Sequence, residues 1–339
     1  MAQKTIAEAL REAIAEEMRR DLTVFCIGED IGIEGGFGGA FTVTLGLEKE
    51  FGHDRILDTP ISEILIAGAA TGAAMTGMRP IADVQYGDFL FCMMDQLVDQ
   101  TAKMRYMSGG KVKVPMVMRA PVGATTRGAQ HAQSLEGFFT HVPGLKVICP
   151  ATAYDAVGLL RTAVHDDDPV IMFEHKKLYG SKGNRAEKGA LSPIGEVPEE
   201  YYTIPFGKAA IRREGKDVTI VANLLMMYNA MQAASILAEE GIDCEVIDPR
   251  TLVPFDYETV YSSIQKTGRL AIVHEDAERN GWGAELAAKV AGEVLYYLDA
   301  PIKRICSYNV PIPFAPVMEN YVVPSVDRIV EEIRNLMKE

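Results

Sequence analysis

The sequence predicts an α/β fold with mainly parallel sheets, divided over two domains. Short apolar strands alternate with helices along nearly the whole chain, an order typical of parallel sheets. The alternation breaks once, in a polar stretch rich in Gly and Pro that begins near Gly180, and then resumes. Because 339 residues suffice for two ordinary domains, we expect a first domain over residues 1–185, a linker over 186–206 and a second domain over 207–339.

The first half of the chain opens with an expected helix. Thr5 followed by Glu8 fits a capping box, and apolar side chains then recur every four residues as far as Met18. The later elements are expected as strands at 22–28, 79–86, 114–121, 145–151 and 169–175, and as helices at 43–52, 60–78, 89–107 and 153–166.

The second half repeats the same rhythm after the linker. Each apolar run is short and is followed by a helical pattern, so a second parallel sheet is expected. The expected strands lie at 217–223, 243–250, 269–275 and 302–307, and the helices at 226–241, 256–268, 283–298 and 326–339.

Composition and charge exclude several classes of protein. The net charge of −13 argues against nucleic-acid binding and against an anionic membrane surface. The N-terminal segment has no apolar core of a signal peptide, and the apolar stretch after Glu63 is too rich in Gly, Ala and Thr for a membrane span. The five cysteines form no C-x-x-C pair. We therefore expect buried free thiols and a cytoplasmic protein.

Glu63 is the one charged residue in the stretch 59–78. We expect Thr59 to cap the helix that follows, with Pro60 at its first position. Glu63 then lies one residue past the capping-box position, and two interpretations stay open: it complements the helix dipole, or it has a functional role. The glycines and alanines behind it predict a tightly packed pair of helices, either within the chain or between subunits. A carboxylate at the mouth of such a contact must be paired or have a raised pKa.

His131 is the second candidate. It lies in a loop of small and polar residues, "GATTRGAQHAQS", after an expected strand. A histidine at such an edge suits proton transfer near neutral pH, although a solvated or core histidine is the commoner case. His141 is the less attractive alternative.

Three further patterns each allow a structural and a functional interpretation. Phe89 lies in an aromatic run and either packs in the core or stacks on a heterocycle. Asp166, Asp167 and Asp168 form either a solvated turn or a site for a hard cation. The glycine-rich loop "GIEGGFGGAF" lacks the Lys-Ser/Thr of a phosphate loop, so a flexible or partner-contacting loop is favoured.

Several motifs together resemble those of a known family. "LDTPISE", "RPIADVQYGDF", "AKMRYMSGG", "GAQHAQS", "PGLKV" and "PATAYDAVGLL" occur in the same order in it. The chain resembles the β subunits of the thiamine-diphosphate-dependent first component of 2-oxo acid dehydrogenase complexes, of the pyruvate dehydrogenase or acetoin dehydrogenase type. The resemblance covers essentially the whole chain. It implies a thiamine-diphosphate-binding, transketolase-like pyrimidine domain followed by a transketolase-type C-terminal α/β domain.

The resemblance also implies roles for single residues. Glu63 corresponds to the glutamate that hydrogen-bonds the aminopyrimidine ring nitrogen of the cofactor, and Gln85 and Phe89 fall at cofactor-binding positions. His131 matches a histidine that handles protons around the acyl intermediate and the lipoyl group. The positions of a structural potassium site are matched by Met116, Ala163, Val164, Asp166 and Asp168.

One absence fits the same interpretation. Thiamine-diphosphate enzymes carry a G-D-G motif for Mg²⁺ and the diphosphate, and this sequence has none. The resemblance therefore implies an α subunit that holds the Mg²⁺, in an α2β2 heterotetramer bound to a dihydrolipoamide acyltransferase core. The expected reaction is decarboxylation of pyruvate or a similar 2-oxo acid with acylation of lipoamide. Cleavage of acetoin, or action on a branched-chain 2-oxo acid, is the alternative.

Overall fold

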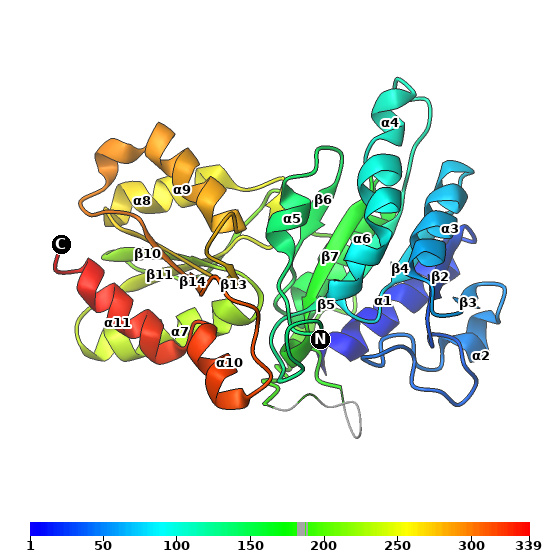
Figure 1. The fold of residues 1–339 in the computed structure, drawn as a ribbon, viewed down its shortest axis with the longest axis horizontal. Helices are drawn as coiled ribbons and strands as arrows, with labels where there is room; N and C mark the ends of the chain where they lie inside the picture. The colour runs from blue at the N-terminus through cyan, green and yellow to red at the C-terminus, as the bar shows by residue number, and fades with distance from the viewer. Residues whose placement is uncertain (182–186, 188) are drawn as a thin grey trace.

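The computed structural model describes residues 1–181, 187 and 189–339, which form two α/β domains side by side (Figure 1). Each domain is built on a mainly parallel sheet with helices packed against it. The predicted fold class is therefore confirmed.

The first sheet has seven strands. In chain order they are β2 (Val24–Gly28), β3 (Ile56–Asp58), β4 (Arg79–Asp83), β5 (Val117–Val122), β6 (Lys146–Ile148), β7 (Val170–His175) and β12 (Thr251–Val253). Their order across the sheet is β12–β6–β7–β5–β4–β2–β3. All neighbours pair in parallel except β12, which pairs antiparallel with β6. Because β12 comes from the second half of the chain, this sheet joins the two domains.

Apolar helices cover both faces of the first sheet. One core lies under α1 (Ile6–Arg20) and α6 (Ala153–His165), and the other lies under α3 (Glu63–Met75). The predicted capping box of α1 is present, with the Thr5 side chain and the Glu8 carboxylate bonded to each other's backbone amides. The amphipathic pattern of the sequence thus places α1 correctly.

The start of α3 differs from the prediction. Ser62, and not Thr59, is its N-cap, and the Ser62 hydroxyl accepts a 3.4 Å hydrogen bond from the Leu65 amide. The Thr59 amide instead donates to the Gly28 carbonyl at 3.0 Å, which continues the pairing of β3 with β2. Strand pairing therefore delays the helix, and Glu63 becomes its first residue.

The expected long helix over 89–107 is also irregular. It divides into the 3₁₀ segment η1 (Gly87–Met93), the π-helix η2 (Asp95–Thr101) and the short helix α4 (Met104–Met107). The Thr101 hydroxyl donates to the Gln96 carbonyl, five residues back, at 2.6 Å. This bond stabilises the wider turn. The helix expected at 43–52 is likewise reduced to α2 (Leu47–Phe51).

The second domain contains a five-stranded sheet. Its strands are β9 (Ala210–Arg213), β10 (Val218–Ala222), β11 (Cys244–Asp248), β13 (Leu270–Ala277) and β14 (Lys303–Ser307). They lie in the order β14–β13–β10–β11–β9, and only β9 pairs antiparallel. Its helices are α7 (Leu224–Glu239), α8 (Tyr257–Thr267), α9 (Trp282–Glu293) with η5 (Leu295–Tyr297), and α11 (Val326–Leu336).

Several short elements have no counterpart in the sequence prediction. A two-stranded sheet pairs β1 (Ala2–Lys4) with β8 (Gly195–Val197), and β8 lies within the stretch expected to be an irregular linker. The others are the strands β3, β9 and β12, the 3₁₀ segment η3 (Lys176–Leu178) and the helices α5 (Glu136–Thr140) and α10 (Pro316–Val322). Such elements are too short to show a hydrophobic period.

Two other sequence expectations concern thiols and membranes. All five cysteines are free, and four are buried, whereas Cys92 is exposed. Its apolar neighbours had suggested burial. Among the helices of the described chain, none combines the length and the apolar character that crossing a bilayer requires.

Candidate active site

The carboxyl ends of the parallel strands meet at one edge of the first sheet. The segments that follow β2, β3, β4, β5 and β7 carry, respectively, Glu29, Glu63, Phe89, His131 and Lys176. In open α/β sheets, ligands bind in the crevice outside this edge. The topology therefore brings three sequence candidates, Glu63, Phe89 and His131, to one edge of one sheet.

Glu63 is half-buried at the N-terminus of α3. Its carboxylate makes no hydrogen bond or ion pair with another residue of the described ranges. Burial raises the pKa of the neighbouring Glu29, and the negative charges of Asp30 and Glu63 raise it further. The Gln85 amide, another candidate, donates to the Glu29 carbonyl at 2.7 Å. Glu63 thus lies in an acidic corner with its own oxygens available to a ligand.

An aromatic group lies next along the same edge. The rings of Tyr86 and Phe89 meet the His131 ring edge to face, at centroid distances of 5.1 and 5.5 Å. The Tyr86 and Phe89 rings are themselves 5.8 Å apart. All three residues are half-buried. The structure therefore places two of the predicted residues, Phe89 and His131, in direct contact.

The loop that carries His131 is tied to the second domain. The amide of Ala124 donates to the Glu275 carboxylate, and the amides of Thr126 and Gly137 donate to Glu319 and Asp276 at 2.7 and 3.1 Å. All three carboxylates are buried. Three acidic side chains of the second domain thus fix the backbone of this loop.

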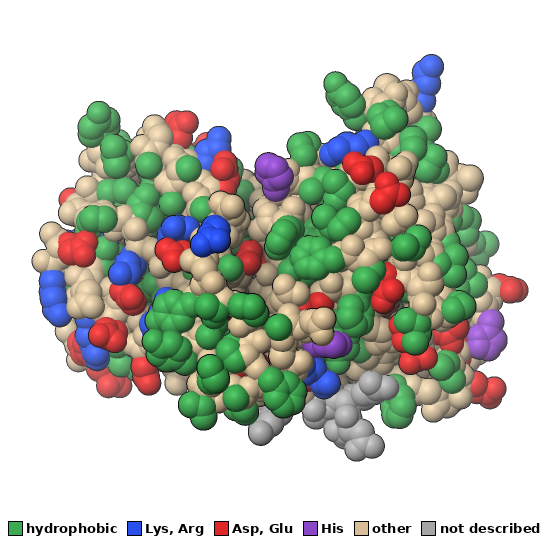
Figure 2. All heavy atoms as spheres, viewed as in Figure 1, with side chains coloured by type: hydrophobic (Ala, Val, Ile, Leu, Met, Phe, Trp, Pro, Cys, Tyr) green, Lys and Arg blue, Asp and Glu red, His purple; other side chains and the backbone are tan. Residues whose placement is uncertain are grey.

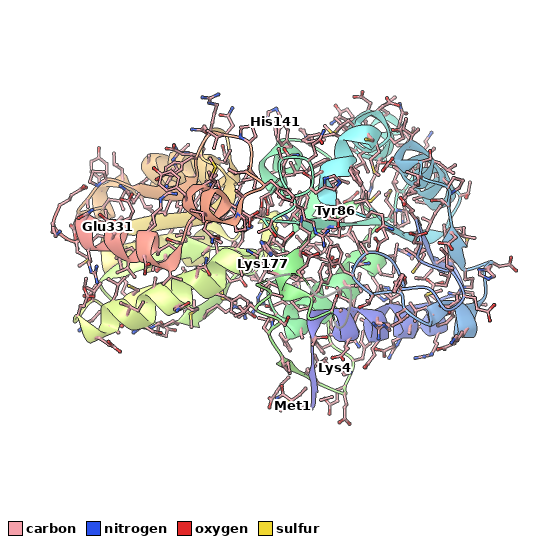
Figure 3. All side chains as sticks on the ribbon, turned by 60° about the horizontal axis from the view of Figure 1, so that its bottom comes forward. Met1, Lys4, Tyr86, His141, Lys177 and Glu331 are labelled. Atoms are coloured by element: carbon pink, nitrogen blue, oxygen red, sulfur yellow. The ribbon has the colours of Figure 1, made fainter. Side chains whose placement is uncertain are left out.

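The alternative histidine, His141, lies elsewhere. It is exposed, directly after α5, on the rim of a cleft of about 1300 Å³ between the two domains. Figure 2 shows the surface hollowed between the domains, and Figure 3 shows His141 well apart from Tyr86. His141 is therefore not part of the aromatic group.

Buried acids lie beneath the same cleft. Burial, and then the charge of Asp276, raise the pKa of Glu136 to about 8, and burial raises the pKa of Asp276 to about 6. Burial would also raise the pKa of Glu275, but His175, 2.9 Å away, reverses the direction and leaves it lowered. These groups join the two domains.

The predicted potassium residues lie at the opposite, amino-terminal edge of the sheet. There the Val164 and Asp166 carbonyls accept hydrogen bonds from the Arg79 guanidinium at 2.8 and 3.1 Å. The Lys146 ammonium bonds both Asp166 oxygens, at 2.7 and 2.6 Å, and lies 3.2 Å from Asp168. The predicted residues lie close together, but Arg79 and Lys146 already donate hydrogen bonds to their oxygens. This set of oxygens therefore fits a further cation poorly. The potassium site stays a prediction.

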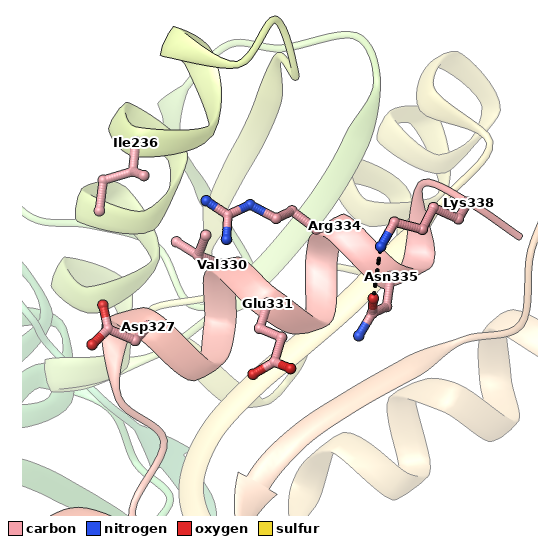
Figure 4. A pocket seen from close by; sticks show the side chains of 7 residues that line it. All are labelled: Ile236, Asp327, Val330, Glu331, Arg334, Asn335 and Lys338. Carbon is pink, nitrogen blue, oxygen red and sulfur yellow. Dashed lines mark hydrogen bonds between the residues drawn. The ribbon is translucent and has the colours of Figure 1, made fainter.

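A smaller cavity of about 500 Å³ lies between α7 and α11, far from this edge (Figure 4). Its lining is mostly charged and exposed, and the Arg334 guanidinium there pairs with Glu240 at 2.8 Å. None of the candidate site residues lines this cavity.

The outer face of α3 is exposed in the single chain. Ile64 and Leu65 of the helix are 58% and 45% exposed, Ile61 just before it is 79% exposed, and a side chain at Gly72 would meet nothing within 4 Å. A monomer does not leave such a face to water without cost. The predicted contact with another subunit would cover it.

Sequence reasoning missed Glu29 and Lys176. Each follows a strand directly, in "CIGED" and "FEHKK". A polar residue just past an apolar parallel strand is the signal that could have identified both, since such residues converge at the carboxyl edge.

Two family models match the chain. The pyrimidine-binding domain of transketolase matches residues 2–182, and the transketolase C-terminal domain matches residues 207–329. A solved split-gene transketolase, described as an inactive β4 tetramer, superposes with a TM-score of 0.78 at 20% identity over 99% of both chains. At that identity the likeness concerns the fold alone.

Curated relatives are similar over their full length. The chain is 47% identical to the β subunit of acetoin:2,6-dichlorophenolindophenol oxidoreductase of Cupriavidus necator, over 100% of this chain and 99% of that one. It is 44% identical to the pyruvate dehydrogenase E1 β subunit of Rickettsia felis, over 98% of both. It is 42% identical to the 2-oxoisovalerate dehydrogenase β subunit of Bacillus subtilis, over 99% of both. The predicted resemblance is confirmed: the chain belongs to this family of oxidoreductase β subunits, built from transketolase pyrimidine-binding and C-terminal domains.

Proposed function

We propose that this chain works with an α subunit as the thiamine-diphosphate-dependent component that cleaves a carbon–carbon bond next to a carbonyl group. The observation that carries the proposal is Glu63, whose half-buried carboxylate has no partner in the described chain and lies at the ligand-binding edge of the sheet. The absence of a G-D-G motif supports an α subunit as the holder of Mg²⁺ and the diphosphate.

The residues present fit the pyrimidine end of the cofactor. Glu63 offers carboxylate oxygens to a protonatable ring nitrogen, and it lies near Glu29, whose pKa is raised first by burial and then by the charges of Asp30 and Glu63. Phe89, whose ring contacts His131 at the same edge of the sheet, offers an aromatic face for stacking. When bound, thiamine diphosphate supplies a nucleophilic carbon and takes up the electrons of the broken bond.

The chain's own residues then act by position and proton transfer. Glu63 would hold and return a proton at the pyrimidine nitrogen. His131 would move a proton at the substrate oxygen or at the accepting lipoyl sulfur. Phe89 and Tyr86 would keep water from these groups, because their rings enclose one side of His131.

The substrate is pyruvate or a similar 2-oxo acid, with lipoamide on an acyltransferase core as acceptor. Acetoin is the second candidate, because two acetoin oxidoreductase β subunits share 47% and 46% identity with this chain, above the 44% and 42% of the 2-oxo acid enzymes. We retain an α2β2 assembly, Mg²⁺ on the α subunit and a cytoplasmic location as predictions.

Glu63→Gln tests the proposal. The amide keeps the size of the side chain but cannot hold the proton, so we expect acceptor reduction by the assembled enzyme to fall about 100-fold or more. The rate is measured with dichlorophenolindophenol as acceptor, for pyruvate, a branched-chain 2-oxo acid and acetoin in turn.

The matched control is Glu239→Gln, an exposed glutamate of α7, which should leave the rate unchanged. Thermal denaturation of both variants establishes that the fold is intact. Wild-type turnover by Glu63→Gln would refute the proposed role of Glu63, and a wild-type enzyme that needs no thiamine diphosphate would refute the function itself.

A further inference from the structure

We propose that Lys176 is a positioning residue for His131, a role that rests on the proposed function of His131. Lys176 directly follows β7 and is 1% exposed. Its ammonium donates a hydrogen bond to the main-chain carbonyl of His131. A lysine so fully buried is rare unless it is paired. The observed partner is the backbone of the loop that carries the histidine.

The same ammonium also lies against a ring that touches His131. The Lys176 nitrogen is 5.1 Å from the centroid of the Tyr86 ring, and that ring meets the His131 ring edge to face, also at 5.1 Å. A cation over an aromatic face is attracted to it. Lys176 therefore fixes both the backbone of His131 and one of the rings that orient its imidazole.

The surroundings keep this lysine charged near neutral pH. Burial lowers its pKa to about 8, a fall that the charges of Asp88, Glu275 and Glu187 oppose and that of Arg127 reinforces. The ammonium thus remains mostly protonated at pH 7 and can donate. Asp88 also accepts from the amide side chain of Gln133 at 2.8 Å, so it links Lys176 to the far side of the same loop.

The other contacts of the loop do not substitute for the hydrogen bond from Lys176 to the His131 carbonyl. Carboxylates of the second domain hold Ala124, Thr126 and Gly137 on either side of the histidine. At His131 itself, the amide donates to the Gly128 carbonyl at 3.2 Å. Among the residues that the structure describes, no other side chain donates to its carbonyl. Without the ammonium, the His131 carbonyl loses its side-chain donor, and the nearest restraint after it is Gln133, whose amide donates to Asp88 at 3.3 Å.

A double-mutant cycle tests the proposal in the assembled enzyme. Lys176→Met keeps an unbranched side chain that is shorter by the terminal nitrogen alone, and so removes the donor. We expect it to slow lipoamide acylation about 10- to 100-fold, since a small misplacement of a reacting group costs that much. In the His131→Ala background the same change should cost almost nothing, because a residue that acts through His131 has no further effect once the imidazole is gone.

The control is Lys177→Met, which alters the adjacent lysine and should leave the rate unchanged. Binding of thiamine diphosphate, followed by quenching of intrinsic fluorescence, should be the same for all variants. If Lys176→Met does not assemble, the cycle is run with Lys176→Arg, which keeps a cationic donor at altered length and should lose less activity.

Each result of this cycle bears on the proposed role of Lys176 or on the role of His131. Equal losses from Lys176→Met with and without His131 would show a general structural role and overturn the proposal, as would wild-type acylation by Lys176→Met. If His131→Ala is inactive while Lys176→Met is fully active, the positioning role of Lys176 is overturned, whereas the proposed role of His131 stands. A fully active His131→Ala enzyme would instead refute the role of His131 on which the proposal rests.

Discussion

His131 is held on one side by aromatic rings and on the other by its loop, and this geometry indicates what its imidazole can do. The Phe89 ring lies 5.5 Å from it and the Tyr86 ring 5.1 Å from it, and His131 remains half-buried. A general acid or base must be presented in this way, fixed but accessible.

Truncation of the histidine should separate two steps of the reaction. We expect His131→Ala to reduce lipoamide acylation at least about 100-fold, because proton transfer contributes that order of rate, and to reduce dichlorophenolindophenol reduction less. Affinity for thiamine diphosphate should not change. Stopped-flow measurement of the two rates provides the comparison.

His141→Ala is the matched control. His141 is exposed at the rim of the interdomain cleft, so its truncation should change neither rate. Equal acylation by His131→Ala and the wild type would exclude a role in this step.

The sequence draws attention to single residues where an isolated chemical group stands out. Glu63 is conspicuous because no other charge surrounds it, and the structure places it at the start of α3. Lys176 and Glu29 are not conspicuous, because lysines and glutamates are common and only folding shows that Lys176 is buried beside His131. Burial is a property of the tertiary structure, and a single sequence does not display it.

Helix α3 packs on an irregular partner, the π-helix η2. The hydroxyls of Thr71 and Thr101 are hydrogen-bonded at 2.6 Å between these two elements, and the Thr101 hydroxyl also reaches the Gln96 carbonyl. Both threonines are buried. The apolar pattern of this stretch predicts a helix but not its type, because the wider turn depends on a side chain that bonds the backbone and on a partner from a distant segment.

Thr101→Val tests the link between α3 and η2. The valine has the same shape but no hydroxyl, so two buried hydrogen bonds are lost and we expect a destabilisation of about 1–2 kcal/mol. Differential scanning calorimetry should then record a Tm lowered by a few degrees.

The control is Thr76→Val, since Thr76 is exposed at the end of α3 and should change stability by less than about 0.5 kcal/mol. A Thr101→Val protein as stable as the wild type would mean that the hydroxyl does not stabilise η2.

The two domains form one structure through contacts that no local pattern reveals. Strand β12 extends the first sheet from the second half of the chain. The Arg212 guanidinium bridges Asp155 of α6 and Asp248 of β11, with Asp248 at 2.7 Å. The alternation of strands and helices predicts both sheets, yet the partners of a three-residue strand or of a half-buried arginine are set by long-range packing. The fold class was therefore predictable, whereas the junction was not.

The domain junction also contains a buried proton. Glu136 is 2% exposed, and burial, then Asp276, raise its pKa from 4.5 to about 8. The native state therefore keeps a proton that the unfolded chain releases above about pH 4.5. The contribution of this carboxyl to stability is complete below that pH and declines by about 1.4 kcal/mol per pH unit as the pH rises towards 8. Glu136→Gln keeps a neutral side chain of the same shape and does not titrate.

We expect the Tm of Glu136→Gln, measured relative to the wild type, to rise steadily between about pH 5 and pH 8. In the wild type alone, a rising pH favours the unfolded state, in which this carboxyl has lost its proton. Thermal denaturation followed by circular dichroism at several pH values gives this difference directly. Glu239→Gln, on an exposed face of α7, should show a constant difference near zero. A constant difference for Glu136→Gln as well would mean that Glu136 is ionised in the native state.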